Sequence, residues 1–229
     1  MYGTDGGPPC RYRSVTPAWS DVNLRELARH IESPLFLAHI RATTGTPVQQ
    51  TNCHPFRHER WLFVHNGALN EFHEIRRDLL LAVDPSLFEG INGSTDSELL
   101  FYLALTFGLE DDPVAGLERA VGFVEATARA RGVEHPVQMT IGVSDGERLW
   151  AVRYSSQHRS RTLFVSDDAA ALRQLHPESE RLQHLTDEDR AVVSEPLGDL
   201  PGVWREVPES TALIIQSGPD EHRAFRPRG

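Results

Sequence analysis

The sequence predicts a single α+β domain, in which antiparallel sheets and helices occupy separate layers. Helical patterns cluster in the middle of the chain, strand-like patterns flank them on both sides, and a hairpin pattern follows them. The regular alternation of strands and helices that a doubly wound parallel sheet needs is missing. With 229 residues and 39% hydrophobic side chains, the chain has the size of one compact domain that can bury a sizeable core.

The first third of the chain predicts a loop, a short helix and two buried strands. Asp21 can cap a helix from Val22 to Ile31, whose apolar residues recur at helical spacing. Leu35–Ile40 and Trp61–His65 are apolar runs of the length expected for buried strands. Polar residues follow each run directly, so we expect these polar residues at strand ends.

Three helices are expected next. Residues Glu71–Leu81 have an apolar face at helical spacing. Thr95 followed by Glu98 has the form of a capping box and begins a second helix. A third helix is predicted from Pro113 to Arg131.

The last part of the chain predicts mainly strands. Val137–Val143 alternates apolar and polar residues, as in a half-buried strand, and Asp145-Gly146 turns the chain into a partner strand at Glu147–Tyr154. The remaining expected elements are strands at Thr162–Val165, Ala191–Val193 and Ala212–Gln216, and a helix between Asp168 and Leu175.

The charge and hydropathy of the chain argue against nucleic-acid and membrane partners. A formal net charge of −10 without a cluster of Lys and Arg argues against nucleic acid. No apolar run reaches transmembrane length, and the first residues lack the apolar core of a secretion signal. We therefore expect a cytoplasmic protein with no membrane partner. Its two cysteines, Cys10 and Cys53, are expected to be free thiols.

Arg41 follows the first predicted strand. A guanidinium fork fixed there could hold a carboxylate by two parallel hydrogen bonds, or it could simply cap the strand end. The next residues, Thr43, Thr44 and Gly45, have hydroxyl and backbone donors that can approach a ligand closely.

His65-Asn66-Gly67 follows the second predicted strand. A side-chain amide next to an unshielded glycine N–H supplies the donors of an oxyanion hole. Asn-Gly is also a common tight-turn dipeptide, so a plain turn is the alternative.

Asp96 lies in the first turn of the helix that Thr95 begins. An acidic residue there can complement the helix dipole, or it can bind the ammonium group of an amino acid. In the second case, Asp96 and Arg41 together would hold both ends of an α-amino-acid head group.

These three elements, in this order, resemble class II glutamine amidotransferases, and most closely the short stand-alone members. Pro17-Ala18-Trp19, Asn23–Leu27 and Val193–Leu197 are also similar to that subgroup, so the resemblance covers nearly the whole chain. It implies the N-terminal nucleophile hydrolase fold, an αββα sandwich of two antiparallel sheets between helical layers. One such domain would span residues 1–229.

The resemblance also implies a chemistry. A cysteine at position one attacks the side-chain amide of glutamine, its own α-amino group acts as the base, a glutamyl thioester forms and ammonia leaves. Arg41 would then bind the glutamine α-carboxylate with the help of Thr44, Asn66 and Gly67 would stabilise the oxyanion, and Asp96 would bind the α-amino group. No cofactor is expected, and the substrate would be glutamine or another γ-glutamyl compound.

The sequence departs from this family at its first residues. Family members begin with Met-Cys and several dozen residues, including two strands, before the Tyr-Gly that Tyr2-Gly3 matches. We therefore expect an N-terminally truncated sandwich that lacks its first strands, lacks the nucleophile and releases no ammonia. The alternative is a non-catalytic amino-acid-binding or partner-binding protein that retains the pocket. A synthase partner and a homodimer are both left open.

Neither thiol is a convincing replacement for the nucleophile. Cys10 lies in a turn-rich segment, and Cys53 is next to His54 on an extended segment, where adjacent side chains point in opposite directions. His54 and His58 have a spacing that suits zinc on a helix, which Pro55 disfavours. We expect no metal site, and we expect the histidines of this region to be hydrogen-bonded at strand ends.

Overall fold

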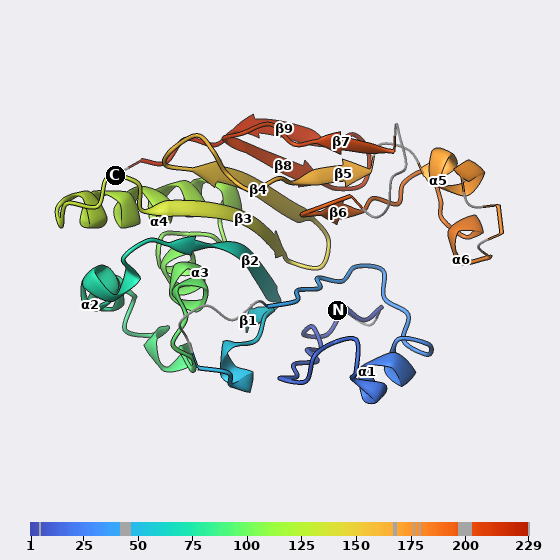
Figure 1. Cartoon of the computed structure of the whole chain (residues 1–229), viewed down its shortest axis with the longest axis horizontal. Helices are drawn as coiled ribbons and strands as arrows, with labels where there is room; N and C mark the ends of the chain where they lie inside the picture. The colour runs from blue at the N-terminus through green and yellow to red at the C-terminus, as the bar shows by residue number, and fades with distance from the viewer. Residues whose placement is uncertain are drawn as a thin grey trace.

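Two antiparallel sheets form the framework of the protein (Figure 1). The computed structural model describes residues 1–4, 6–41, 47–166, 169–175, 177–178, 180–196 and 203–228. The larger sheet contains, in spatial order, β1 (Phe56–His58), β2 (Trp61–Leu69), β3 (Val137–Ser144), β4 (Leu149–Ser155), β8 (Thr211–Ile215) and β9 (Glu221–Ala224). The smaller sheet has the order β6 (Val192–Val193), β5 (Phe164–Ser166) and β7 (Trp204–Glu206).

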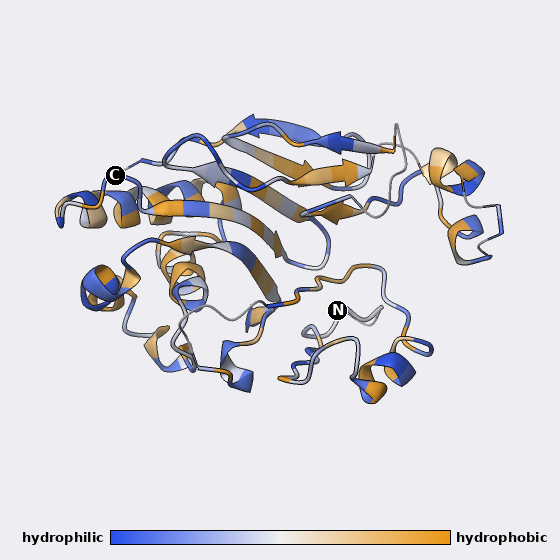
Figure 2. Cartoon of the chain, viewed as in Figure 1, coloured by the Kyte–Doolittle hydropathy of each residue, from blue (hydrophilic) through white to orange (hydrophobic). Residues whose placement is uncertain are grey.

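Helices cover one face of the larger sheet (Figure 1). They are α2 (Phe72–Ala82), α3 (Asp96–Thr106) and α4 (Pro113–Arg129). The core lies between them and the sheet, where the rings of Phe63 on β2 and Phe101 on α3 stack at 5.0 Å. Figure 2 shows apolar residues concentrated on α3 and on the strands beside it. Among the described residues, no helix is long and apolar enough to cross a membrane.

The smaller sheet packs against the opposite face of the larger one. Alternate residues of β4 and β8 point to opposite faces. Trp150 and Ile214 therefore join the core under the helices, whereas Ala151 and Leu213 pack with Val165 of β5. The order of layers is helices, large sheet and small sheet, which confirms the predicted α+β class with two antiparallel sheets.

Short elements lie at the margins. These are α1 (Val22–Leu27), the 3₁₀ helices η1 (Gln50–Asn52) and η2 (Phe88–Gly90), α5 (Ala169–Leu175) and α6 (Glu180–Gln183). In Figure 1, α5 and α6 lie beyond one end of the smaller sheet. The predicted helix at Asp168–Leu175 is therefore present from Ala169, while Asp168 lies outside the described residues.

Residues 35–40 correct the sequence prediction. This segment forms no strand, although its side chains alternate between half-buried and exposed, with Phe36 and Ile40 exposed. A strand requires a ladder of backbone hydrogen bonds to a neighbour, and the described residues provide none for this segment. The helix predicted for Val22–Ile31 is also shorter, because it ends at Leu27.

Candidate active site

Asn66 and Gly67 lie inside β2. The sequence predicts a strand end or a turn for these two residues, and the structure shows neither. The strand continues to Leu69 because residues 62–69 pair without interruption with β3. Long-range pairing thus overrides the local turn preference of Asn-Gly. Side chains alternate along the strand, so Asn66 projects from the face of the sheet opposite to the one that carries Phe63 and Leu69 in the core.

The backbone N–H of Gly67 points away from β3. In an antiparallel pair, successive N–H groups alternate between the two edges of a strand. The N–H of Asn70 donates to Pro136 on the β3 side, and that of Leu69 donates to Asp96 on the other side. Gly67 is two residues before Leu69, so its N–H points toward the same edge as the Leu69 N–H.

No larger residue fits at position 67. A Cβ atom on Gly67 would overlap the backbone carbonyl of Gln138 and would lie 2.7 Å from Nε2 of His65. Since the first of these neighbours is backbone of β3, it cannot move aside without disturbing the ladder. Glycine is therefore required here by close packing.

The side chain of Asp96 links the first turn of α3 to β2 by hydrogen bonds. One carboxylate oxygen accepts the Leu69 N–H at 2.8 Å, and the other accepts the Ser97 N–H at 2.8 Å. Thr95 caps the helix by accepting the Glu98 N–H at 3.1 Å. Asp96 is only half-buried, and a carboxylate has about four lone-pair sites, so it keeps acceptor capacity for a ligand.

Only the Thr95 half of the predicted capping box forms. The Glu98 carboxylate turns away from the helix cap and accepts the N–H groups of Asn92 at 3.1 Å and Gly93 at 2.6 Å. Burial raises the pKa of Glu98, and these two hydrogen bonds oppose that shift. Glu98 thus holds the loop before α3 in place.

Three histidines form a cluster that the sequence did not predict. The rings of His39 and His54 lie 4.0 Å apart, and Nδ1 of His65 lies 2.9 Å from the Ser97 hydroxyl. Among the described residues, four buried ring nitrogens have no hydrogen-bond partner: Nδ1 of His39, both nitrogens of His54, and Nε2 of His65. The expectation of hydrogen-bonded histidines at strand ends is therefore wrong for these atoms.

Burial keeps this cluster neutral. It lowers the pKa of His39 to about 4, with smaller contributions from the charges of His65 and Arg41, and a hydrogen bond to the His65 backbone opposes the shift. Burial also lowers the pKa of His54 well below its usual value. For His65, burial lowers the pKa and the charge of Asp96 partly offsets it.

Both predicted charged ligand-binding residues act electrostatically on this cluster. Arg41, at the end of the extended segment, is half-buried and acts electrostatically on His39 and His54. Asp96 acts electrostatically on His65. The predicted partners of Arg41, namely Thr43, Thr44 and Gly45, lie outside the described residues.

The two thiols lie in different surroundings. Cys53 is half-buried, and its sulfur lies 3.4 Å from the carbonyl oxygen of Ser14 and 3.6 Å from that of Gln49. Cys10 is exposed in the N-terminal loop. Among the described residues, the side chains whose ligand atoms come close enough to hold a metal ion are His58, Glu59 and Glu110, and His54 is not part of that group.

A model of the family described as class-II glutamine amidotransferases matches residues 14–222. The chain belongs to the class-II glutamine amidotransferase family. The probable glutamine amidotransferase DUG3 of Saccharomyces cerevisiae is 32% identical over 91% of this chain. A glutamine–fructose-6-phosphate aminotransferase of Mesorhizobium japonicum is 28% identical over 84% of it. The matched parts span 64% and 31% of these two longer proteins, respectively.

Two solved structures have a fold similar to that of this chain. A glutamine aminotransferase class-II domain protein from Silicibacter pomeroyi is 37% identical, with a TM-score of 0.83, and the match covers 100% of this chain and 90% of that one. The glutamine phosphoribosylpyrophosphate amidotransferase of B. subtilis, at 17% identity, has a TM-score of 0.52 over 83% of this chain and 34% of its own. The second likeness shows the shared fold alone.

Proposed function

We propose that this class-II glutamine amidotransferase binds glutamine, or another γ-glutamyl amide, at the edge of β2 that faces Asp96. The observation that carries this proposal is the direction of the Gly67 N–H, which points to the same strand edge as the Leu69 N–H held by Asp96. The carbonyl oxygen of the substrate amide would accept hydrogen bonds from this N–H and from the Asn66 side chain. Both donors would strengthen as negative charge develops on that oxygen.

The two charged residues that act on the histidine cluster suit the two ends of an amino-acid head group. Arg41 would hold the α-carboxylate, for which a bidentate guanidinium fork is well adapted. Asp96 would accept hydrogen bonds from the α-ammonium group with the acceptor sites that Leu69 and Ser97 leave unused. The neutral histidines on which they act add no charge that would compete with either group.

Amide hydrolysis in this family also needs a thiolate. The thiolate attacks the amide carbon, the tetrahedral intermediate expels ammonia, and water hydrolyses the thioester that remains. Cys53 is hydrogen-bonded to the Ser14 and Gln49 carbonyls, and Cys10 is in an exposed loop. We therefore expect the chain of Met1–Gly229 to bind glutamine without releasing ammonia.

Calorimetric titration with L-glutamine tests the binding. Asp96→Asn keeps an oxygen that can accept the Leu69 N–H but removes the negative charge, and Arg41→Gln removes the guanidinium fork. Each should weaken binding by about tenfold or more, since hydrogen bonds to charged groups contribute about 1.5–3 kcal/mol. Asp111→Asn, at an exposed position before α4, is the matched control. Equal affinity in all four proteins would contradict the proposal.

A non-catalytic amino-acid-binding protein is the second candidate, and the surroundings of the two thiols favour it. An ammonia assay with glutamine separates the two, when combined with inspection of the coding region for an in-frame Met-Cys upstream of Tyr2. Such a codon pair, and ammonia release by the protein it encodes, would support the enzyme. Glutamine binding without either would support the binding protein.

A further inference from the structure

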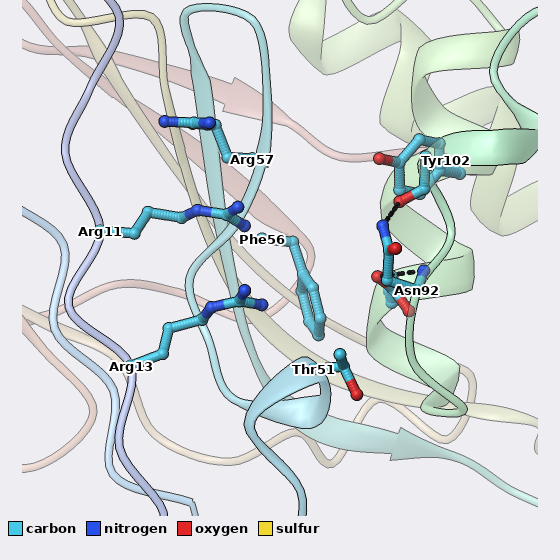
Figure 3. Close-up of a pocket in the computed structure, with 9 residues that line it drawn as sticks. Arg11, Arg13, Thr51, Phe56, Arg57, Asn92 and Tyr102 are labelled. Atoms are coloured by element: carbon cyan, nitrogen blue, oxygen red, sulfur yellow. Dashed lines mark hydrogen bonds between the residues drawn. The ribbon is translucent and has the colours of Figure 1, made fainter.

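Three arginines line a cavity of about 270 Å³ on the side of α3 that carries Glu98. Arg11 and Arg13 come from the N-terminal loop, and Arg57 comes from β1. Figure 3 shows the side chains of Arg11 and Arg13 reaching across toward Phe56 and Thr51, while that of Arg57 turns back toward the loop. Their guanidinium groups thus gather on one side of the cavity.

Polar groups face them from the other side. Tyr102 and Asn92 lie opposite the arginines in Figure 3, and Glu98 also lines the cavity. Glu98 already accepts two backbone N–H groups from the loop before α3. Its carboxylate therefore already stabilises that loop. Glu98 is the sole acidic residue among the described side chains that line this cavity.

The cavity has a positive charge that the described residues do not balance. Three guanidinium groups against one carboxylate leave an excess of two positive charges, in a protein whose net charge is −10. Within the described part of the chain, no carboxylate lies within ion-pairing distance of Arg11, Arg13 or Arg57. Burial lowers the pKa of Arg11, and the neighbouring charges of Arg13 and Arg57 lower it further, while those of Tyr102 and Glu98 oppose the shift.

A purely structural role explains only part of this arrangement. Nη1 of Arg57 donates to the Pro9 carbonyl at 2.9 Å and so fastens the N-terminal loop to β1. The carbonyl of Arg13 accepts a hydrogen bond from Gln50, but that bond uses its backbone and leaves its guanidinium unassigned. Like charges held together in a half-buried cavity repel each other, and a bound anion would relieve that repulsion.

We propose that this cavity binds a phosphate group. At neutral pH a phosphate monoester has a charge of about −1.5 to −2, which matches the excess of two positive charges. Guanidinium forks are the side chains best adapted to phosphate oxygens. A second cavity of about 380 Å³, which shares all three arginines and adds Cys10 and Gln50, gives room for the organic part of a phosphate monoester.

This binding site is separate from the glutamine pocket. The first turn of α3 carries both Asp96, which faces β2, and Glu98, which faces the arginines. The phosphate proposal does not rest on the proposed function, because none of its three arginines takes part in amide binding.

Calorimetric titration of the full chain with inorganic phosphate, and then with methyl phosphate, tests the proposal at constant ionic strength. One phosphate should bind per chain, and Arg11→Gln should weaken it by about tenfold, the effect expected for one charge-assisted hydrogen bond. Arg77→Gln, on the exposed face of α2, removes the same charge and should leave the affinity unchanged. Affinity should fall as salt is added.

Two titration results would overturn the assignment. The first is phosphate binding that Arg11→Gln and Arg13→Gln both leave intact. The second is equally tight binding of malonate, which has two negative charges but lacks the tetrahedral oxygens. If a variant unfolds, the thermal midpoint of the native protein gives an independent measure, because a ligand that binds only the folded state raises it. A thermal midpoint that rises no more with phosphate than with chloride at the same ionic strength would also refute the site.

Discussion

Acid should destabilise this protein through His39. In the unfolded chain an imidazole takes up a proton near pH 6.5, whereas burial keeps His39 neutral in the folded state until about pH 4. Between these two values the unfolded state binds more protons, so the free energy of unfolding rises with pH. The stabilisation is therefore complete above pH 6.5 and is lost as the pH falls from 6.5 toward 4.

The size of the effect follows from the difference between the two pKa values. Each pKa unit corresponds to about 1.4 kcal/mol. Solvent contact at the half-buried ring reduces the contribution. We expect His39 alone to account for about 2 to 3 kcal/mol of stability lost across this range. His54 and His65, whose pKa values are also lowered by burial, add to the loss in the same direction.

Urea unfolding of the native protein and of His39→Gln, from pH 6.5 to pH 4, measures this loss. Carboxylates contribute equally to the stability of both proteins. The difference between their free energies of unfolding therefore measures the contribution of His39. The free energy of unfolding of the native protein, relative to that of His39→Gln, should decrease as the pH falls. His30→Gln, at an exposed position, controls for the removal of an imidazole. Parallel curves for the native protein and His39→Gln would refute the reasoning, as would an NMR titration that finds His39 protonating near pH 6.5.

Three further changes test the packing of the site. Gly67→Ala should lower the free energy of unfolding by about 1–3 kcal/mol in denaturant titration, because its Cβ overlaps the Gln138 carbonyl; unchanged stability would show that β3 can yield. Asp96→Ala should cost about 1–3 kcal/mol through the orphaned Leu69 N–H, and Asp96→Asn should cost clearly less in the same assay. Thr95→Ala should cost about 1 kcal/mol by loss of the α3 cap, and Thr95→Ser should restore most of it; equal losses in both would argue against capping.

Local patterns predicted the elements whose stability depends on their own sequence. The alternation in Val137–Val143 predicted β3, because one face of that strand is buried under helices. The hairpin with β4 is also present, but its loop runs from Asp145 to Arg148 and β4 begins at Leu149 and not at Glu147. Thr95 caps α3 as expected, since a cap needs only residues within one turn. Local sequence was therefore sufficient for these elements.

Features set by distant residues could not be predicted in this way. Residues 35–40 have the composition of a strand but no paired strand among the described residues. Asn66-Gly67 has the composition of a turn, yet pairing with β3 keeps it extended. The contact of Asp96 with the Leu69 N–H joins residues 27 positions apart. The sequence thus names candidate site residues, but their contacts could not be predicted from it.

The NMR signals of β2 test the central claim most directly. Because we expect no turnover, ¹⁵N-labelled protein can be titrated with L-glutamine at equilibrium. The Gly67 backbone amide and the Asn66 side-chain amide should shift together and saturate at the dissociation constant found by calorimetry, and Asp96→Asn should weaken both responses. Saturable glutamine binding that leaves the Gly67 and Asn66 signals unmoved would contradict the account.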